Sequence, residues 1–207
     1  MTSLEIERKL ISQGYRLIGG VDEVGRGCLA GPVAAGFVIF PPDVDDSLLS
    51  SVTDSKKLTA PKREHLLKAI KSESLCAEVG WASVAEIDEL GIAVATKLAM
   101  MRAMEKSIIQ PDYLLVDAVK LDECPVPYKA IVKGDLISRT IAAASIIAKV
   151  TRDLHMFGLG MEYPGYSFEK NKGYGTKDHM IAIKSRGPTE IHRGSFEPMA
   201  SMKSHPG

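Results

Sequence analysis

Five short apolar runs, separated mostly by helical patterns, constrain the fold of this sequence more than any other feature. Each run is four to eight residues long and is bounded by glycine, proline or polar residues, as expected of buried strands. The first two are joined by a glycine-rich stretch. The runs cover residues 17–21, 33–40, 77–82, 113–117 and 129–132. This order predicts an α/β fold built on a mixed sheet.

Local capping signals define the expected helices. Thr59 can cap one helix, and Ser83–Glu86 fits a capping box that opens a helical region broken at Gly91. Small apolar residues make the helix after Ser138 suited to packing against a sheet. The expected helices cover residues 3–13, 60–71, 83–109, 138–153 and 177–184. We expect one domain over residues 1–207, with a helical C-terminal part from about residue 160.

The charge of the chain is balanced overall but not evenly distributed. There are 26 Lys and Arg residues against 26 Asp and Glu residues, so the total charge does not indicate a polyanionic partner. Residues 129–193, however, hold 11 basic against 6 acidic residues, a net charge of +5. A locally basic surface on a neutral chain can bind nucleic acid, although a solvated helical face explains the same charges.

Several classes of protein are excluded by composition. The sequence is 45% hydrophobic and 25% charged, which is ordinary for a globular protein and excludes a disordered chain. No apolar stretch approaches the roughly 18 residues needed to cross a bilayer, and no signal peptide is visible. The three cysteines, Cys28, Cys76 and Cys124, form no C-x-x-C pair and argue against a disulfide framework. We therefore expect a cytoplasmic protein.

Four carboxylates are the strongest candidates for chemistry. Asp22 and Glu23 follow one apolar strand, Asp117 ends another, and Asp135 precedes the helix that begins near Ser138. If the two strands are parallel neighbours, their acids meet at one edge of the sheet, where α/β proteins bind ligands. Clustered carboxylates suit Mg²⁺ or Mn²⁺. Since neighbours on a regular strand point to opposite faces, Asp22 and Glu23 can share a metal only if the strand ends or bends there.

Two glycine-containing segments are further candidates. Gly25, Arg26 and Gly27 lie in a stretch that matches the dinucleotide fingerprint, but a strand follows where that motif requires a helix. These glycines can instead bring the backbone close to a phosphate or sugar, or form a plain hairpin turn. Tyr174 lies between Gly173 and Gly175 in the basic half of the chain. An exposed ring there could stack on a base or sugar, whereas a packed tyrosine would have only a structural role.

Together these residues resemble type 2 ribonuclease H, the bacterial ribonuclease HII family. The resemblance spans about residues 17–196, with the motifs in family order. Cys28 stands where the family usually has proline, and Val24 where it has alanine. The motifs are residues 20–33 (GVDEVGRGCLAGPV), 54–58 (DSKKL), 115–117 (LVD), 133–135 (KGD), 141–153 (IAAASIIAKVTRD), 172–176 (KGYGT) and 191–193 (IHR).

The resemblance implies a ribonuclease H-like fold, with a five-stranded mixed sheet, flanking helices and a helical C-terminal extension. It also implies metal-dependent cleavage of RNA in RNA–DNA hybrids and 5′ to single ribonucleotides in duplex DNA, with 3′-hydroxyl and 5′-phosphate products. Such an enzyme removes ribonucleotides during DNA replication and repair. Two Mg²⁺ or Mn²⁺ ions would be held by the family's four acids, which fall on Asp22, Glu23, Asp117 and Asp135.

The same resemblance implies the residues that read the substrate. The family's Gly-Arg-Gly element falls on Gly25, Arg26 and Gly27, and its junction-reading tyrosine falls on Tyr174. The backbone of the glycine element would approach the 2′-hydroxyl, which distinguishes RNA from DNA. Basic residues near these motifs are candidate phosphate contacts, although exposed residues that serve solubility explain them equally well. These candidates are Lys56, Lys172 and Arg193.

Two other functions remain open from sequence alone. One is a nucleic-acid binding module that does not cleave, although four clustered acids beside a polyanion disfavour it. The other is a different ribonuclease H-like nuclease, such as a junction resolvase or ribonuclease HIII, the latter usually with an additional N-terminal domain. Nothing in the sequence demands more than a monomer.

Overall fold

The computed structural model describes residues 2–47, 49–53, 55, 58–122 and 124–204. Asp54 and the candidate phosphate contact Lys56 therefore lie outside the described residues. The strands are β1 (Ile18–Val24), β2 (Val33–Ile39), β3 (Cys76–Ala82), β4 (Tyr113–Asp117) and β5 (Tyr128–Ile131). The helices are α1 (Glu5–Ser12), α2 (Ala60–Glu73), α3 (Val84–Leu90), α4 (Ile92–Glu105), the 3₁₀ helix η2 (Gly134–Leu136), α5 (Arg139–Glu162), α6 (Phe168–Asn171), α7 (Lys177–Arg186) and α8 (Met199–Ser204).

The five strands form one mixed sheet in the order β3-β2-β1-β4-β5. β1 pairs antiparallel with β2, and β2 pairs antiparallel with β3. β1 pairs in parallel with β4, which in turn pairs in parallel with β5. A short loop joins the antiparallel pair β1 and β2, whereas α2 lies in the connection from β2 to β3 and α3 and α4 lie in the connection from β3 to β4. The expected α/β fold with a mixed sheet is confirmed.

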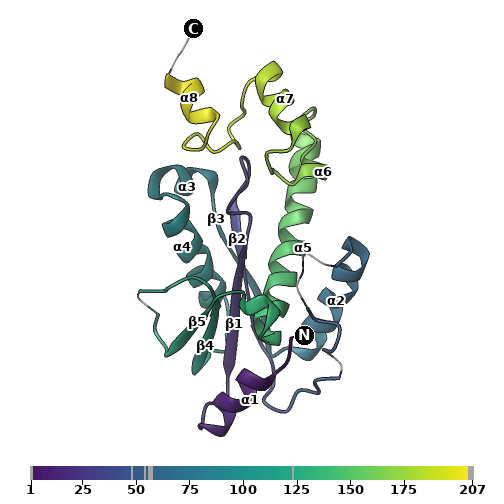
Figure 1. The fold of residues 1–207 in the computed structure, drawn as a ribbon, viewed down its shortest axis with the longest axis vertical. Helices are drawn as coiled ribbons and strands as arrows, with labels where there is room; N and C mark the ends of the chain where they lie inside the picture. Colours follow the sequence, from purple (N-terminus) through teal and green to yellow (C-terminus); the bar gives the residue numbers. More distant parts are fainter. Residues whose placement is uncertain (1, 48, 54, 56–57, 123, 205–207) are drawn as a thin grey trace.

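Helices cover both faces of this sheet (Figure 1). α4 packs on one face, over a core that includes Val21, Phe37 and Met100. α5 packs on the other face and is covered in turn by α2. A side chain at Gly36 of β2 would lie 2.1 Å from the carbonyl oxygen of Ala144, so glycine at this position allows α5 to approach the sheet closely.

The helix α5 is longer than the sequence indicates. It was expected to end near Asp153 but continues to Glu162. The extension buries Met156 and Leu159, and another element packs closely against one of its two glycines. A side chain at Gly160 would lie 2.9 Å from the backbone nitrogen of Glu169 in α6.

The C-terminal elements form the upper part of the view in Figure 1, where α6 and α7 lie beside the end of α5. Tyr166 and Phe168 stack there with ring centroids 5.5 Å apart. Thr176 caps α7, because its side chain accepts a hydrogen bond from the backbone of His179. Among the described residues, no helix combines the length and apolar character that spanning a bilayer requires.

At the opposite end of the molecule, α1 caps the start of α5. The buried Glu7 Oε1 accepts hydrogen bonds from Ser138 Oγ at 2.6 Å and from the backbone nitrogen of Thr140 at 3.1 Å. The backbone of Ser3 also exchanges hydrogen bonds with Ile137 and Arg139. The N-terminal segment therefore holds the chain that links η2 to α5.

Candidate active site

The parallel pairing of β1 with β4 brings the first two acids together. Val21 is the register partner of Val116, so Asp22 and Asp117 are the next residues on neighbouring strands. Asp22 is 5% exposed. Its register partner on β2 is Gly36, so it lies on the sheet face that α5 covers. The parallel pairing of the two strands, on which the predicted meeting of Asp22 and Asp117 depended, is thus present.

The strand does not end at Asp22 and Glu23, in contrast to one possibility left open by the sequence. β1 continues through Val24, and its pairing with β2 remains regular up to Ala34. Asp22 and Glu23 therefore leave the strand towards opposite faces, and the strand end or bend expected for a metal that both residues share is absent at these two positions. The two carboxyl groups nevertheless interact. The charge of Glu23 raises the pKa of Asp22, and the charge of Asp117 raises the pKa of both groups.

Burial and mutual repulsion make the carboxylates costly to ionise. Burial raises the pKa of Asp22 well above its usual value, and the charges of Glu23 and Asp117 raise it further. A hydrogen bond from Ser145 of α5 acts in the opposite direction. Burial also raises the pKa of Glu23, against the ion pair that Arg26 makes with it at 3.4 Å. A cation in this region would relieve both penalties.

Asp135 lies in η2, whose first residue contacts Asp117 at the end of β4. The backbone nitrogen of Gly134 donates a 2.6 Å hydrogen bond to Asp117 Oδ1, which fixes the start of η2 against the end of β4. Lys133 adopts a left-handed backbone conformation, with φ of 56°, and so turns the chain into η2. Asp135 itself is 5% exposed. All four acids expected from the sequence thus come from elements that meet at one end of β1 and β4.

The donor chemistry of these residues fits a divalent cation. All four candidates supply carboxylate oxygens, the ligands that Mg²⁺ and Mn²⁺ prefer. Glu23 Oε2 is buried and has no hydrogen-bond partner, so it is an orphaned acceptor beside the other acids. Within the residues that the structure describes, no three His, Cys, Asp or Glu side chains lie close enough together to hold a single metal ion.

The loop that joins β1 to β2 carries Gly25, Arg26 and Gly27 and is held by a buried arginine. Arg152 of α5 donates hydrogen bonds to the carbonyls of Pro32 at 2.9 Å, Lys172 at 2.9 Å and Ala30 at 3.2 Å. Gly25 has φ of 93°, and a side chain there would lie 2.3 Å from Arg152 Nε. Glycine is therefore required at Gly25, whereas Gly27 faces open space.

Arg193 does not lie where a phosphate contact would. Its side chain is fully buried, and its guanidinium donates to the carbonyl oxygens of Gly25 at 2.7 Å, Arg26 at 2.8 Å and Gly31 at 2.9 Å. The expectation that Arg193 contacts phosphate is corrected, because its donors are used inside the protein. Lys172 is half-buried, and its Nζ donates to the carbonyl of Glu169 at 2.7 Å.

Tyr174 lies beside this loop with its ring partly open to solvent. The side chain is 40% exposed, and Lys149 Nζ lies 5.9 Å from the ring centroid. The backbone nitrogen of Leu29 donates to the carbonyl of Gly173 at 2.7 Å. Burial raises the pKa of the Tyr174 phenol, and the neighbouring Cys28 raises it further. The structure thus joins the two glycine-containing segments that the sequence singled out separately.

Sequence reasoning assigned no role to three polar residues, of which two contact the site and the third holds the start of α5. Arg152 and Ser145 are buried polar residues that interrupt the apolar pattern of α5. This interruption is the feature of the sequence that could have indicated their roles. Ser145 Oγ lies 2.9 Å from Ser55 Oγ and also bonds Asp22. No local pattern indicates Glu7, whose partners lie more than 130 residues away.

Known proteins are similar to this chain over most of its length. The family model for ribonuclease HII matches residues 19–199. A ribonuclease HII from Dehalococcoides mccartyi strain BAV1 is 50% identical over 196 residues, which cover 95% of this chain and 92% of that protein. One from Desulfitobacterium hafniense strain DCB-2 is 49% identical over 196 residues, covering 95% of this chain and 74% of that protein.

A solved structure extends the agreement to the fold. The crystal structure of ribonuclease H2 from Pyrococcus horikoshii OT3 matches with a TM-score of 0.78 and 26% identity. The match covers 91% of this chain and 97% of that chain. With the family model and the close relatives, it establishes the ribonuclease H-like fold. The chain therefore belongs to the ribonuclease HII family, as an endoribonuclease that cleaves RNA in RNA–DNA hybrids.

Proposed function

We propose that this protein cleaves duplex DNA 5′ to a single embedded ribonucleotide, as well as RNA in hybrids, and leaves 3′-hydroxyl and 5′-phosphate ends. The observation that carries the proposal is the position of Tyr174 beside the loop of Gly25–Gly27. Together they offer an exposed ring and a glycine backbone, two features that can contact one nucleotide and its neighbour.

The four acids are proposed to hold two divalent ions, Mg²⁺ or Mn²⁺. Asp22, Glu23, Asp117 and Asp135 supply the oxygen donors, and the unpartnered Glu23 Oε2 supports a role in binding. When bound, such ions supply an activated water and stabilise the charge that develops on the leaving oxygen. The raised pKa values of Asp22 and Glu23 indicate that these side chains gain from a neighbouring cation.

Recognition of the ribonucleotide is assigned to the backbone of the β1–β2 loop. Gly27 has no neighbouring atoms within 4 Å of the position of a Cβ, so a sugar can approach its backbone. A 2′-hydroxyl both donates and accepts hydrogen bonds, which backbone groups can satisfy. The exposed ring of Tyr174 would stack on the adjacent deoxyribose and disfavour a second ribonucleotide there. Lys172 is proposed as a phosphate contact, since it lies next to this segment.

The protein is proposed to act as a cytoplasmic monomer. All three cysteines are free, in agreement with a reducing compartment. The proposed substrates are RNA–DNA hybrids and duplex DNA that holds embedded ribonucleotides.

The test uses a DNA duplex with one ribonucleotide and an all-DNA control, each incubated with Mg²⁺, Mn²⁺ or EDTA. We expect a metal-dependent nick 5′ to the ribonucleotide and none in the control duplex. Asp117→Asn should abolish the nick while the fold is retained, whereas Asp43→Asn, at an exposed carboxylate, should cleave normally. Near-native cleavage by folded Asp117→Asn would refute the role of Asp117. Cleavage of the all-DNA control would favour a nuclease that does not require the 2′-hydroxyl, and binding without a nick would favour a binding module.

A further inference from the structure

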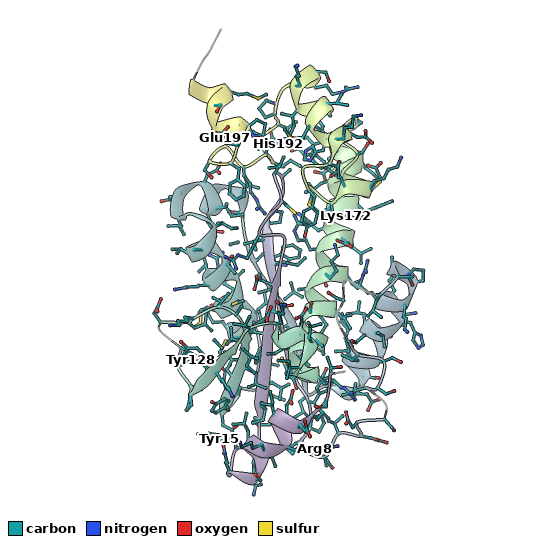
Figure 2. All side chains as sticks on the ribbon, in the orientation of Figure 1. Arg8, Tyr15, Tyr128, Lys172, His192 and Glu197 are labelled. Atoms are coloured by element: carbon teal, nitrogen blue, oxygen red, sulfur yellow. The ribbon has the colours of Figure 1, made fainter. Side chains whose placement is uncertain are left out.

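Two buried histidines contact each other, and one of them contacts the main chain of Tyr174. His179 of α7 is fully buried and His192 is 4% exposed. The Nε2 atoms of the two rings are 3.1 Å apart. Aromatic rings enclose the pair, with Tyr166 5.1 Å from His192 and Phe168 5.3 Å from His179, as measured between ring centroids. Figure 2 labels His192 in the C-terminal part of the molecule, in the same region as Lys172. The catalytic scheme above uses neither histidine.

The hydrogen bonds at both ends of the pair determine where its protons lie. His179 Nδ1 is 2.9 Å from the carbonyl oxygen of Tyr174, which can only accept, so Nδ1 carries a proton. In a neutral imidazole, His179 Nε2 is then an acceptor, and its partner His192 Nε2 must be the donor. His192 Nδ1 is consequently an acceptor, and the backbone nitrogen of Thr189 donates to it at 2.9 Å.

This assignment is consistent from one end to the other. The amide of Thr189 donates to His192, His192 donates to His179, and His179 donates to the carbonyl of Tyr174. All four ring nitrogens are satisfied only in this direction, since reversing it would place a lone pair against a carbonyl oxygen. We call this chain of hydrogen bonds, from the amide of Thr189 to the carbonyl of Tyr174, the relay. It requires neutral rings, and burial favours them because it lowers the pKa of both histidines.

The segment that carries His192 also holds the β1–β2 loop. The backbone nitrogen of Gly31 donates to the carbonyl of Ile191 at 2.8 Å, and Ala30 forms a β-bridge with His192. The next residue, Arg193, binds the carbonyls of the glycine loop, as described above. One side of this short segment therefore supports the loop, and the other supports Tyr174 through His179.

We propose that His179 and His192 are positioning residues that set the main chain of Tyr174 relative to the loop of Gly25–Gly27, and thereby the preference for an isolated ribonucleotide. The relay needs His179 in the Nδ1–H form and His192 in the Nε2–H form. This inference rests on the proposed role of Tyr174, but the relay itself can be measured without any substrate.

The first experiment measures the two tautomers by long-range ¹H–¹⁵N correlation spectra of the ¹⁵N-labelled protein at neutral pH. We expect His179 to be protonated on Nδ1 and His192 on Nε2. Protonation of both rings on Nε2, or a charged ring at neutral pH, would overturn the relay whether or not the protein cleaves any substrate.

The second experiment compares His179→Leu with His179→Asn, two side chains of similar shape. The asparagine amide can still donate to the carbonyl of Tyr174, whereas leucine cannot. We define selectivity as kcat/KM on a single-ribonucleotide duplex divided by kcat/KM on a long hybrid. It should fall about three- to tenfold in the leucine variant, as expected for one lost hydrogen bond, and recover in the asparagine variant. Equal selectivity in both variants and the wild type would overturn the proposal.

A double variant and an exchange measurement separate positioning from a general loss of structure. Adding His179→Leu to Tyr174→Ala should not lower selectivity further if His179 acts through Tyr174, and an additional loss would contradict this. Backbone amide exchange at Thr176, which also donates to the Tyr174 carbonyl, should be faster in His179→Leu than in His179→Asn. This readout requires no activity, so it decides the positioning role even if single ribonucleotides are not cleaved. Equal exchange in the two variants would overturn that role.

Discussion

Replacing Arg193 tests whether this residue supports the substrate-reading loop or contacts the substrate itself. The structure places its guanidinium against three loop carbonyls, with no exposed surface on the side chain. Arg193→Met removes the hydrogen bonds and approximately keeps the apolar part of the side chain. Arg193→Lys keeps the positive charge, but one ammonium group cannot reproduce the planar fork of donors.

The expected loss of stability follows from the groups left without partners. The carbonyls of Gly25 and Gly31 accept from Arg193 in buried hydrogen bonds, and each costs about 1–3 kcal/mol when its donor is removed. The carbonyl of Arg26 lies nearer the surface and can be hydrated. Some free energy is regained because the guanidinium no longer has to be desolvated. We therefore expect Arg193→Met to lower the free energy of unfolding by about 2–4 kcal/mol.

Urea denaturation followed by fluorescence of Trp81, the single tryptophan, measures this loss. Arg193→Lys should lose nearly as much stability as Arg193→Met, and Lys184→Met, at an exposed position on α7, should lose little. A phosphate contact would behave differently. Its removal should make the fall of the log binding constant for duplex nucleic acid with log salt concentration shallower, by about 0.9 in the slope. Unchanged stability in Arg193→Met together with a shallower salt slope would refute the supporting role.

Three further predictions concern other parts of the molecule. Tyr174→Ala should weaken cleavage at an isolated ribonucleotide more than cleavage of a long hybrid, and equal losses of kcat/KM on both substrates would contradict junction reading. Glu7→Ala should lower the free energy of unfolding by about 1–3 kcal/mol, because Ser138 and the first turn of α5 lose their acceptor; Glu5→Ala, at an exposed position, is the control in the same denaturation assay. Burial lowers the pKa of His192 from 6.5 to about 4, so the folded state binds fewer protons than the unfolded state between these values. The contribution of His192 to the free energy of unfolding should consequently be constant above pH 6.5 and fall by up to about 3 kcal/mol as the pH drops to 4. His192→Gln should reduce this pH dependence, which thermal unfolding at several pH values can measure.

The sequence by itself located the strands and most of the helices along the chain, because their signals are local. Apolar runs of strand length bounded by turn residues located all five strands, and the Ser83–Glu86 capping box is present in the structure. The same reasoning expected Asp22 and Asp117 to meet if β1 and β4 were parallel neighbours, and the structure contains that pairing. These features depend on residues close in the chain or on a general rule of α/β sheets.

Local patterns were less informative where elements end. β1 passes through Asp22 and Glu23 to Val24 because β2 continues to supply hydrogen-bond partners. α5 extends to Glu162 because the C-terminal elements cover its later turns, including Gly160. In both cases the limit is set by a neighbour in space.

Only the tertiary structure decided the roles of the buried polar residues. Arg193 appeared to be a candidate phosphate contact, but its partners in the β1–β2 loop lie more than 160 residues away in the chain. The direction of the His179–His192 relay depends on a carbonyl at one end and an amide at the other. A buried charge or imidazole is stable only when its partners are supplied, and those partners are brought to it by the folding of the whole chain.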